Sequence, residues 1–523
     1  MTDVVKPAVV AEDRDSGDMS ARHLHDNVDG KRSSWLVGHM TALTVASALV
    51  IPLLYLFYVN HYALNVFQFD DWGSVGFLNA AIHGHLTFNE LWVQHHEDRL
   101  FLQNIILVLF AFIDRFDLRS VILAGAAVFI ATYGLLLVLF QRYISTPLKP
   151  IPVLIVGLVW FSIGDFSNAL TLSLALYLQL FFFLAMLVAF VVPNKHRGFW
   201  FSIAVVAAIA SSLSVIQGFL VWPMGAICIF WCQPWARRAK LEVGVWILAM
   251  VGTLVVYLPG YQGSGCDIAH CSVSGSLAHP GLTVQSFLVV LGGVIPGGAP
   301  LGGPVTSSFG RFEVVGLALL AACVFILIQS WRNRSTRERI PLPMLLICFC
   351  LLADAMTVLG RSAVGLNALV NSNRYMLPNQ VLLVAIIMYA WAHLPNVRVI
   401  SRERIWRASL TWLALLLLGI LVVAQVAIST SFGLNNGRAE NHFLTQQARL
   451  LINLDKVPVQ DRSCELGYVL WLGLAPASTY RTQRLVAEKD RFGEFQSNSY
   501  YEKLGPPPLL PICSKAGGSA PPF

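Results

Sequence analysis

Charged side chains are scarce in this chain. Of its 523 residues only 12% are Asp, Glu, Lys or Arg, while 56% are hydrophobic. A soluble globular domain carries about 25% charged residues, so this composition excludes an ordinary soluble fold. Apolar runs of the length that crosses a bilayer, about 17–25 residues, recur from Trp35 to Ile428. The sequence therefore predicts an all-α polytopic membrane protein.

Several functional motifs are also missing. There is no GxxxxGK[ST] loop, no GxGxxG after a strand and no nucleophile elbow, which argues against ATP-driven and serine-hydrolase chemistry. Residues His95-His96-Glu97 do not have the HExxH spacing of a zinc site, so we assign no metal ligands. We find no inverted repeat of the kind that points to a transporter.

The basic residues are unevenly distributed between the predicted loops. Twenty of the 36 Lys and Arg residues lie in the segments 1–34, 141–150, 193–198, 233–241, 332–340 and 395–408, and the opposite loops up to residue 428 hold only six. By the positive-inside rule we expect a multi-pass protein of the plasma (inner) membrane with a cytoplasmic N-terminus and an extracytoplasmic C-terminus. This distribution explains the net charge of +7 without a nucleic-acid partner.

Loop charge and apolar length together predict about eleven crossings. We place them at 35–59, 119–141, 151–164, 170–192, 199–213, 216–232, 241–259, 312–331, 341–359, 375–394 and 408–428. Residues 35–59 are expected to stay as a helix, since no small-residue cleavage site follows them. The apolar stretches 100–113 and 284–296 are too short to cross and are predicted to lie at or re-enter the outer face.

Three parts of the chain follow from this topology. They are a cytoplasmic tail at 1–34, a transmembrane domain at 35–428 with outer loops 60–118 and 260–311, and a small extracytoplasmic segment at 429–523. Four cysteines fall in outer segments, which permits two disulfides in an oxidising compartment, most simply Cys266–Cys271 and Cys464–Cys513.

An acidic pair, Asp70 and Asp71, follows the first apolar run. Charge at a membrane boundary is costly, so such a pair is a functional hypothesis by default. Two carboxylates so close cannot both ionise freely, and one of them is suited to act as a general base or to bind a divalent cation. The alternative is that the pair caps a helix that starts near Ser74.

Two further clusters lie on the same predicted face. His95, His96 and Arg99 form a polar patch that suits a phosphate or a sugar, or simply the head-group region. Arg361 and Arg374 stand at the ends of two predicted spans, where they either bind a phosphate or anchor their helices. Asp354, seven residues before Arg361, is interpreted as its structural partner.

Four stretches carry a resemblance to a known class of enzymes. They are FDDWGS at 69–74, QHHEDRLFLQN at 94–104, QGFLVWPMG at 217–225 and GRSAVGLNALVNSNRY at 360–375. With the first helix and the acidic outer loop, they resemble the GT-C class of integral membrane glycosyltransferases, chiefly bacterial members and relatives of the protein-mannosyltransferase family. The sequence departs from the class at Asp98, where a basic residue is usual, and at Asn373, where serine is usual.

The resemblance implies a GT-C-like fold, an outward-facing site and an inverting sugar transfer from a polyprenyl-phosphate donor. In that case Asp70 or Asp71 is the base, and the donor phosphate or sugar is held by His95, His96, Arg99, Arg361, Arg374 and Tyr375. The acceptor is a glycan, a lipid or a protein of the cell envelope. The competing interpretations are a transporter or flippase of lipid-linked glycans and a polymerase of different fold.

Overall fold

The computed structural model describes residues 19–95, 97–144, 147–191, 196–232, 237–262, 273–297, 309–332, 341–362, 365–371, 375–393, 405–453, 456, 484, 486–495 and 503–504. In these ranges the chain is helical and contains no strand; a single antiparallel bridge joins His95 to Asp98. The prediction of an all-α protein is confirmed. The four cysteines proposed to form disulfides lie outside the described residues.

The described helices differ widely in length, from 3 residues to 48. In chain order they are α1 (Met19–Tyr62), η1 (Phe69–Ser74), α2 (Val75–Ile82), α3 (Phe88–Leu91), α4 (Phe101–Asp114), α5 (Leu118–Ile144), α6 (Pro150–Trp160), η2 (Ile163–Asp165), α7 (Phe166–Leu170), α8 (Leu174–Val191), α9 (Arg197–Ser212), η3 (Ile216–Leu220), α10 (Val221–Cys232), α11 (Arg237–Tyr257), α12 (Val273–Ala278), α13 (Pro280–Gly292), α14 (Gly310–Arg332), α15 (Leu342–Arg361), α16 (Leu366–Asn371), α17 (Met376–His393), α18 (Ile405–Ile452) and η11 (Gly493–Phe495), where η marks a 3-10 helix.

Nine helical segments of the described chain are long and apolar enough to cross a membrane. This finding confirms a polytopic architecture. Two of the eleven predicted crossings, 199–213 and 216–232, correspond to shorter apolar helices, α9 with 16 residues and α10 with 12. The two stretches that we excluded as crossings form the short helices α4 and α13, with 14 and 13 residues.

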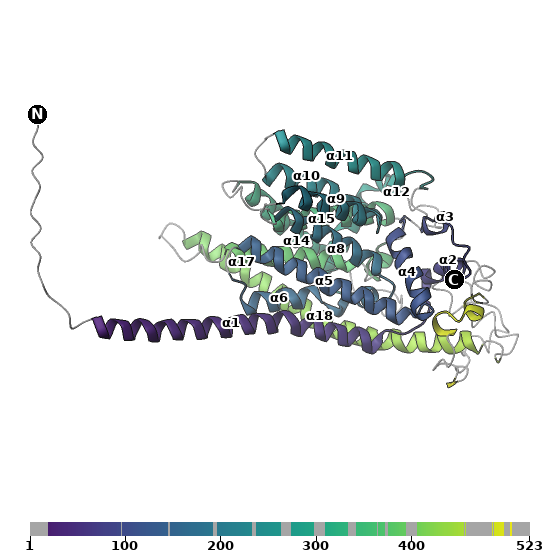
Figure 1. Ribbon diagram of the computed structural model, residues 1–523, viewed down its shortest axis with the longest axis horizontal. Coiled ribbons are helices and arrows are strands. Elements are labelled where there is room, and N and C mark those ends of the chain that lie inside the picture. The colour runs from purple at the N-terminus through teal and green to yellow at the C-terminus, as the bar shows by residue number, and fades with distance from the viewer. Residues whose placement is uncertain are drawn as a thin grey trace, which may run out of the picture.

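The long helices run side by side along the longest axis of the molecule (Figure 1). Helices α1 and α18 form one edge of the bundle and α11 the opposite edge, while α2, α3 and α4 gather at one end (Figure 1). We call this the acidic-loop end, because η1 with Asp71 lies there. Arg142, Arg197 and Arg332 lie at the opposite ends of their helices α5, α9 and α14.

Aromatic side chains form much of the core between α1, α5, α6 and α8. The Phe129 ring stacks on Trp160 with centroids 5.3 Å apart and on Tyr177 at 4.7 Å. Trp160 and Tyr177 are fully buried, and each buried aromatic ring removes 150–250 Å² of surface from solvent. The contacts join the last residue of α6, Trp160, and the first turn of α8, which contains Tyr177, to the middle of α5.

Helix α18 does not end where the last apolar run ends. It continues without a break from Ile405 to Ile452, past the predicted end of the transmembrane domain at residue 428. The Gln425 carboxamide donates to the hydroxyls of Ser162 (2.9 Å) and Ser429 (3.3 Å), which ties the helix to the turn after α6. Near the end of the helix, the Gln447 carboxamide donates to the Phe67 carbonyl at 3.0 Å, so the last turns of α18 belong to the acidic-loop end.

Candidate functional site

The acidic loop, residues 67–72, is held by its own carboxylate. Asp71 is 7% exposed, and its Oδ2 accepts a hydrogen bond of 3.0 Å from the Gln68 backbone N–H. The Ser74 hydroxyl donates to the Asp71 carbonyl. Asp71 thus caps η1 rather than α2. The side chain of Asp70 lies outside the described residues, and its backbone belongs to η1.

Gly73, directly after the acidic loop, lies beside His95 of the second cluster. A Cβ built on Gly73 would lie 3.8 Å from the ring of His95. His95 begins a tight turn in which its N–H donates to the Asp98 carbonyl (2.7 Å) and the Asp98 N–H donates back (2.9 Å). His96, inside this turn, lies outside the described residues. The turn places segment 94–99 beside the acidic loop.

Segment 94–99 is also fastened to the chain that follows α11. The Gln94 carboxamide donates to the Gln262 carbonyl at 2.6 Å and accepts from the Gln262 N–H at 2.9 Å. The Tyr261 hydroxyl donates to the Glu97 carbonyl at 2.9 Å. With its backbone held in this way, the segment presents Glu97 and Asp98 in fixed positions.

Asp98, in the second stretch of the resemblance, is tied to the residue that precedes the third stretch. Its Oδ1 accepts a hydrogen bond of 2.6 Å from the N–H of Ile216, the first residue of η3. Burial raises the pKa of the Asp98 carboxyl to about 6, although the Ile216 N–H lowers it in part. Where a basic residue is usual in the class, this chain has a carboxylate that supports the fold.

Arg361 joins the fourth stretch of the resemblance to segment 94–99. Its guanidinium donates to the Glu97 carboxylate through Nε at 2.8 Å and through a second N–H, and to the Tyr375 hydroxyl at 2.5 Å. Both partners of the ion pair are half-buried, with about a fifth of each side chain exposed (22% and 21%), which strengthens the attraction over that of an open surface pair.

The interpretation of Asp354 as the partner of Arg361 is wrong. Seven residues on one helix face are about 10 Å apart along the axis, and the Arg361 guanidinium reaches across to Glu97 instead. The Asp354 side chain is 1% exposed, and its Oδ2 has no hydrogen-bond partner in the described part of the chain. Helix geometry permits a shared face but not a contact over this distance.

Arg99 is a buried anchor for the segment. Its guanidinium donates to the carbonyls of Pro259 (2.7 Å) and Trp92 (3.3 Å), and it lies over the rings of Trp92 and Tyr257 at 5.4 and 5.8 Å. Only 5% of the residue is exposed, so the structure places it behind the polar cluster. Arg374, the other predicted phosphate ligand, lies outside the described residues, whereas Tyr375 binds Arg361.

Two acidic residues at this end were not selected from the sequence. Glu97 lies in the second cluster. Its negative charge is the one sequence feature that suggests a pairing with Arg361, which is 264 residues away. Glu494 lies in a segment without a motif, and its Oε2 accepts a hydrogen bond of 3.0 Å from the Phe67 N–H of the acidic loop. No sequence pattern predicts this second contact.

The described side chains do not assemble a metal centre. Among them, no group of three or more His, Cys, Asp and Glu residues has the arrangement of a metal site.

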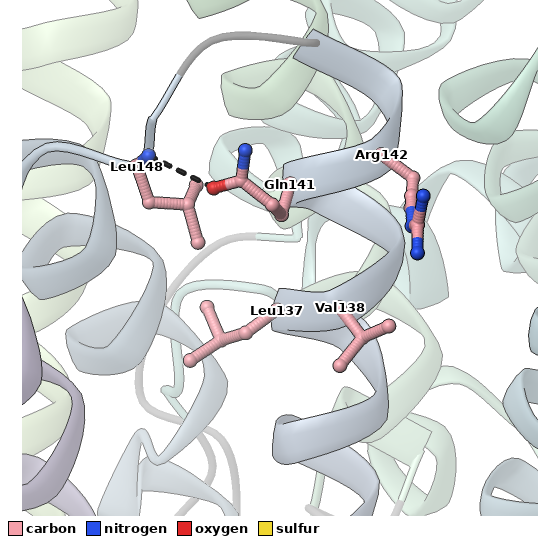
Figure 2. A pocket seen from close by; sticks show the side chains of 5 residues that line it. All are labelled: Leu137, Val138, Gln141, Arg142 and Leu148. Atoms are coloured by element: carbon pink, nitrogen blue, oxygen red, sulfur yellow. Dashed lines mark hydrogen bonds between the residues drawn. The ribbon is translucent and has the colours of Figure 1, made fainter.

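A groove of about 710 Å³ lies at the other end of α5 and is lined by Leu137, Val138, Gln141, Arg142 and Leu148 (Figure 2). The Gln141 Oε1 accepts from the Leu148 N–H at 2.9 Å. Leu118, at the first end of α5, bonds to Asn65 near the acidic loop; the 24 residues from Leu118 to Arg142 span about 36 Å. The groove is thus separate from the polar cluster.

The geometry brings four distant stretches of the chain together at one end of a helical bundle. Gly73 meets His95, Asp98 meets Ile216, and Glu97 meets Arg361, which binds Tyr375. Comparison of the chain with family models, with curated proteins and with solved structures finds no match.

Proposed function

We propose that the protein is a membrane glycosyltransferase of GT-C type that moves a sugar from a polyprenyl-phosphate donor to a cell-envelope acceptor. The single observation that supports this most is the ion pair of Glu97 with Arg361, because it joins the second stretch of the resemblance to the fourth, while Gly73 of the first stretch lies beside His95. On this proposal the chain crosses the membrane eleven times, with α9 and α10 among the crossings, and the acidic-loop end faces outward.

The proposed reaction is an inverting displacement at the anomeric carbon. An acceptor hydroxyl attacks this carbon and loses its proton to a carboxylate of the acidic loop, while the bond from the carbon to the donor phosphate oxygen breaks. The polyprenyl phosphate leaves with the electron pair of that bond. Arg361, already at the site, offers N–H donors that stabilise the charge of the leaving phosphate.

The two aspartates have different roles in this proposal. One oxygen of Asp71 is committed to the Gln68 N–H and fixes η1. Asp70, its neighbour in η1, is the proposed base. His95 and Tyr375 contact the sugar or the phosphate, together with His96 and Arg374, and Arg99 holds the segment from behind. Pre-arranged donors of this kind contribute several kcal/mol to a transfer reaction.

The test uses the purified full-length protein with radiolabelled polyprenyl-phosphate sugars and a cell-envelope extract. We expect transfer by the wild type, loss of at least 100-fold in Asp70→Asn and Arg361→Gln, and near wild-type transfer in Asp114→Asn, which removes a carboxylate from the same outer segment. Unchanged transfer in both Asp70→Asn and Asp71→Asn would remove the pair from the mechanism. Flipping of a lipid-linked glycan in liposomes, without transfer, would favour a transporter.

A further inference from the structure

The segment 484–495 packs directly on the acidic loop. Phe492 and Phe67 are fully buried in one apolar cluster with Phe116, and the Phe67 ring lies 5.7 Å from that of Phe116. Gly493 adopts a φ of +53°, and a Cβ at this position would lie 2.5 Å from the Phe67 ring. Only glycine fits here, because both the backbone conformation and the space exclude a side chain.

Hydrogen bonds fix the register of this contact. The Asn65 carboxamide donates to the Gly493 carbonyl at 2.9 Å, and Gln447, near the end of α18, donates to the Phe67 carbonyl at 3.0 Å. The backbone of the acidic loop is thus held by the two parts of the chain that follow the last apolar run.

Two carboxyl groups hold consecutive amides of the loop. The Phe67 N–H donates to Glu494 Oε2 and the Gln68 N–H donates to Asp71 Oδ2, each at 3.0 Å. The negative charge of Asp71 also acts on Glu494. Glu494 is 1% exposed, and its Oε1 has no partner among the described residues. Burial of a carboxyl with one unpaired oxygen disfavours its charged form, and the charge of Asp71 adds to this effect.

We infer that Glu494 is a positioning residue of the acidic loop and that, with Asp71, it forms a clamp whose closed state is stabilised by protonation of Glu494. The clamp fixes the backbone on both sides of Asp70, which lies between Gln68 and Asp71 in η1. Its role in sugar transfer rests on the proposed function, whereas the clamp itself does not. The segment after α18 is thereby part of the site.

The other ionisable groups around the clamp have partners of their own or lie at the surface. Asp490 binds Asn79 and faces His83, and Arg484 faces Glu488. In the turn between α4 and α5, Asp114 and Asp117 accept from backbone N–H groups, and Arg449 of α18 binds Gln446 and the Leu504 carbonyl. Arg115 and Arg491 are exposed. Asp71 is therefore the charge that acts most directly on Glu494.

The direction of the pH effect follows from the carboxyl group. Burial, and then the charge of Asp71, raise the pKa of Glu494 from 4.5 to about 8. A group whose pKa is raised in the closed state stabilises that state fully below pH 4.5. This stabilisation declines as the pH rises and is lost above about pH 8. Between pH 6.5 and 9 the population of the open loop should rise on the order of 30-fold.

Amide hydrogen exchange of the full-length protein, read by mass spectrometry on peptides covering residues 63–75, tests the clamp. After correction for intrinsic exchange, we expect wild-type protection at Phe67 and Gln68 to fall by about 10- to 30-fold between pH 6.5 and 9. Glu494→Gln keeps the acceptor and removes the charge, so its protection should stay level. Glu488→Gln, an exposed neighbour on the same segment, should behave as the wild type.

The inference would be overturned if protection fell as much in Glu494→Gln as in the wild type, or if it did not fall in the wild type. If Glu494→Gln does not fold, Asp71→Asn serves instead: removal of the other charge should make the fall in protection smaller, while burial, the larger cause, remains, and an unchanged fall would overturn the role of Asp71. The alkaline limb of the transfer rate should move to higher pH in Glu494→Gln. A fall in the wild type and a level exchange profile in Glu494→Gln, without any transfer activity of the wild type, would sustain the clamp and refute the glycosyltransferase proposal.

Discussion

Replacing Asp98 by asparagine should stabilise the protein at neutral pH. The carboxyl is withdrawn from water, and its pKa rises from 3.8 to about 6, so the folded state favours the neutral form. Asparagine is neutral at every pH and still offers an oxygen to the Ile216 N–H, which donates at 2.6 Å. The substitution removes the cost of the buried charge and keeps the contact.

The magnitude follows from the shift in pKa. About two pKa units correspond to about 3 kcal/mol. The raised pKa means that the wild type is penalised least below pH 3.8, that the penalty grows as the pH rises, and that it is complete above about pH 6. The advantage of Asp98→Asn should grow from about 0.6 kcal/mol at pH 4 to about 3 kcal/mol at pH 8.

Thermal unfolding in mild detergent, followed by tryptophan fluorescence, measures this difference. Glu494 titrates in both proteins, so its effect on stability cancels when the two are compared at the same pH. Asp114→Asn, whose carboxylate also accepts a backbone N–H in the same outer segment, reports the effect of losing one negative charge. A difference between Asp98→Asn and wild type that is independent of pH, or a less stable variant at pH 8, would refute the reasoning.

Three further predictions concern the supports of the site. Gly218→Ala should destabilise the protein by about 1–3 kcal/mol, because its Cβ would meet a backbone carbonyl at 1.9 Å, whereas Gly198→Ala meets nothing within 4 Å and should be tolerated in a thermal melt. Arg99→Lys should cost about 1–3 kcal/mol in the same measurement, since one ammonium cannot reproduce the two carbonyl contacts and the ring stacking. Glu97→Gln and Arg361→Gln should each cost about 1–3 kcal/mol. The double variant should cost less than their sum, with a coupling of about 0.5–3 kcal/mol; strict additivity would show that the ion pair contributes nothing.

The membrane class was predictable because it depends on composition and run length alone. A bilayer demands long apolar helices, and nine described segments meet this demand. Length also separated α4 and α13 from the long helices. The assignment of α9 and α10 as crossings rested on loop charge together with apolar length, and both helices are short.

The candidate site was predictable only in part. The motifs pointed to the acidic loop, segment 94–99 and Arg361, which the structure brings together. Individual roles were not predictable, since residue type does not reveal orientation. Arg99 has the side chain of a phosphate ligand, yet its guanidinium is enclosed by carbonyls and rings. Asp354 shares a helix face with Arg361 but is too far along the axis to pair with it.

The sequence by itself determined that the protein belongs in a lipid bilayer and that its chain forms helices there. A chain with 12% charged residues must satisfy its backbone within helices in the bilayer. Only the tertiary structure decided that Glu97 pairs with Arg361 and that Glu494 holds the acidic loop. These contacts join residues 264 and 427 positions apart, and no local periodicity encodes them. Burial and proximity set the charge state of each group, and both properties exist only once the helices have packed.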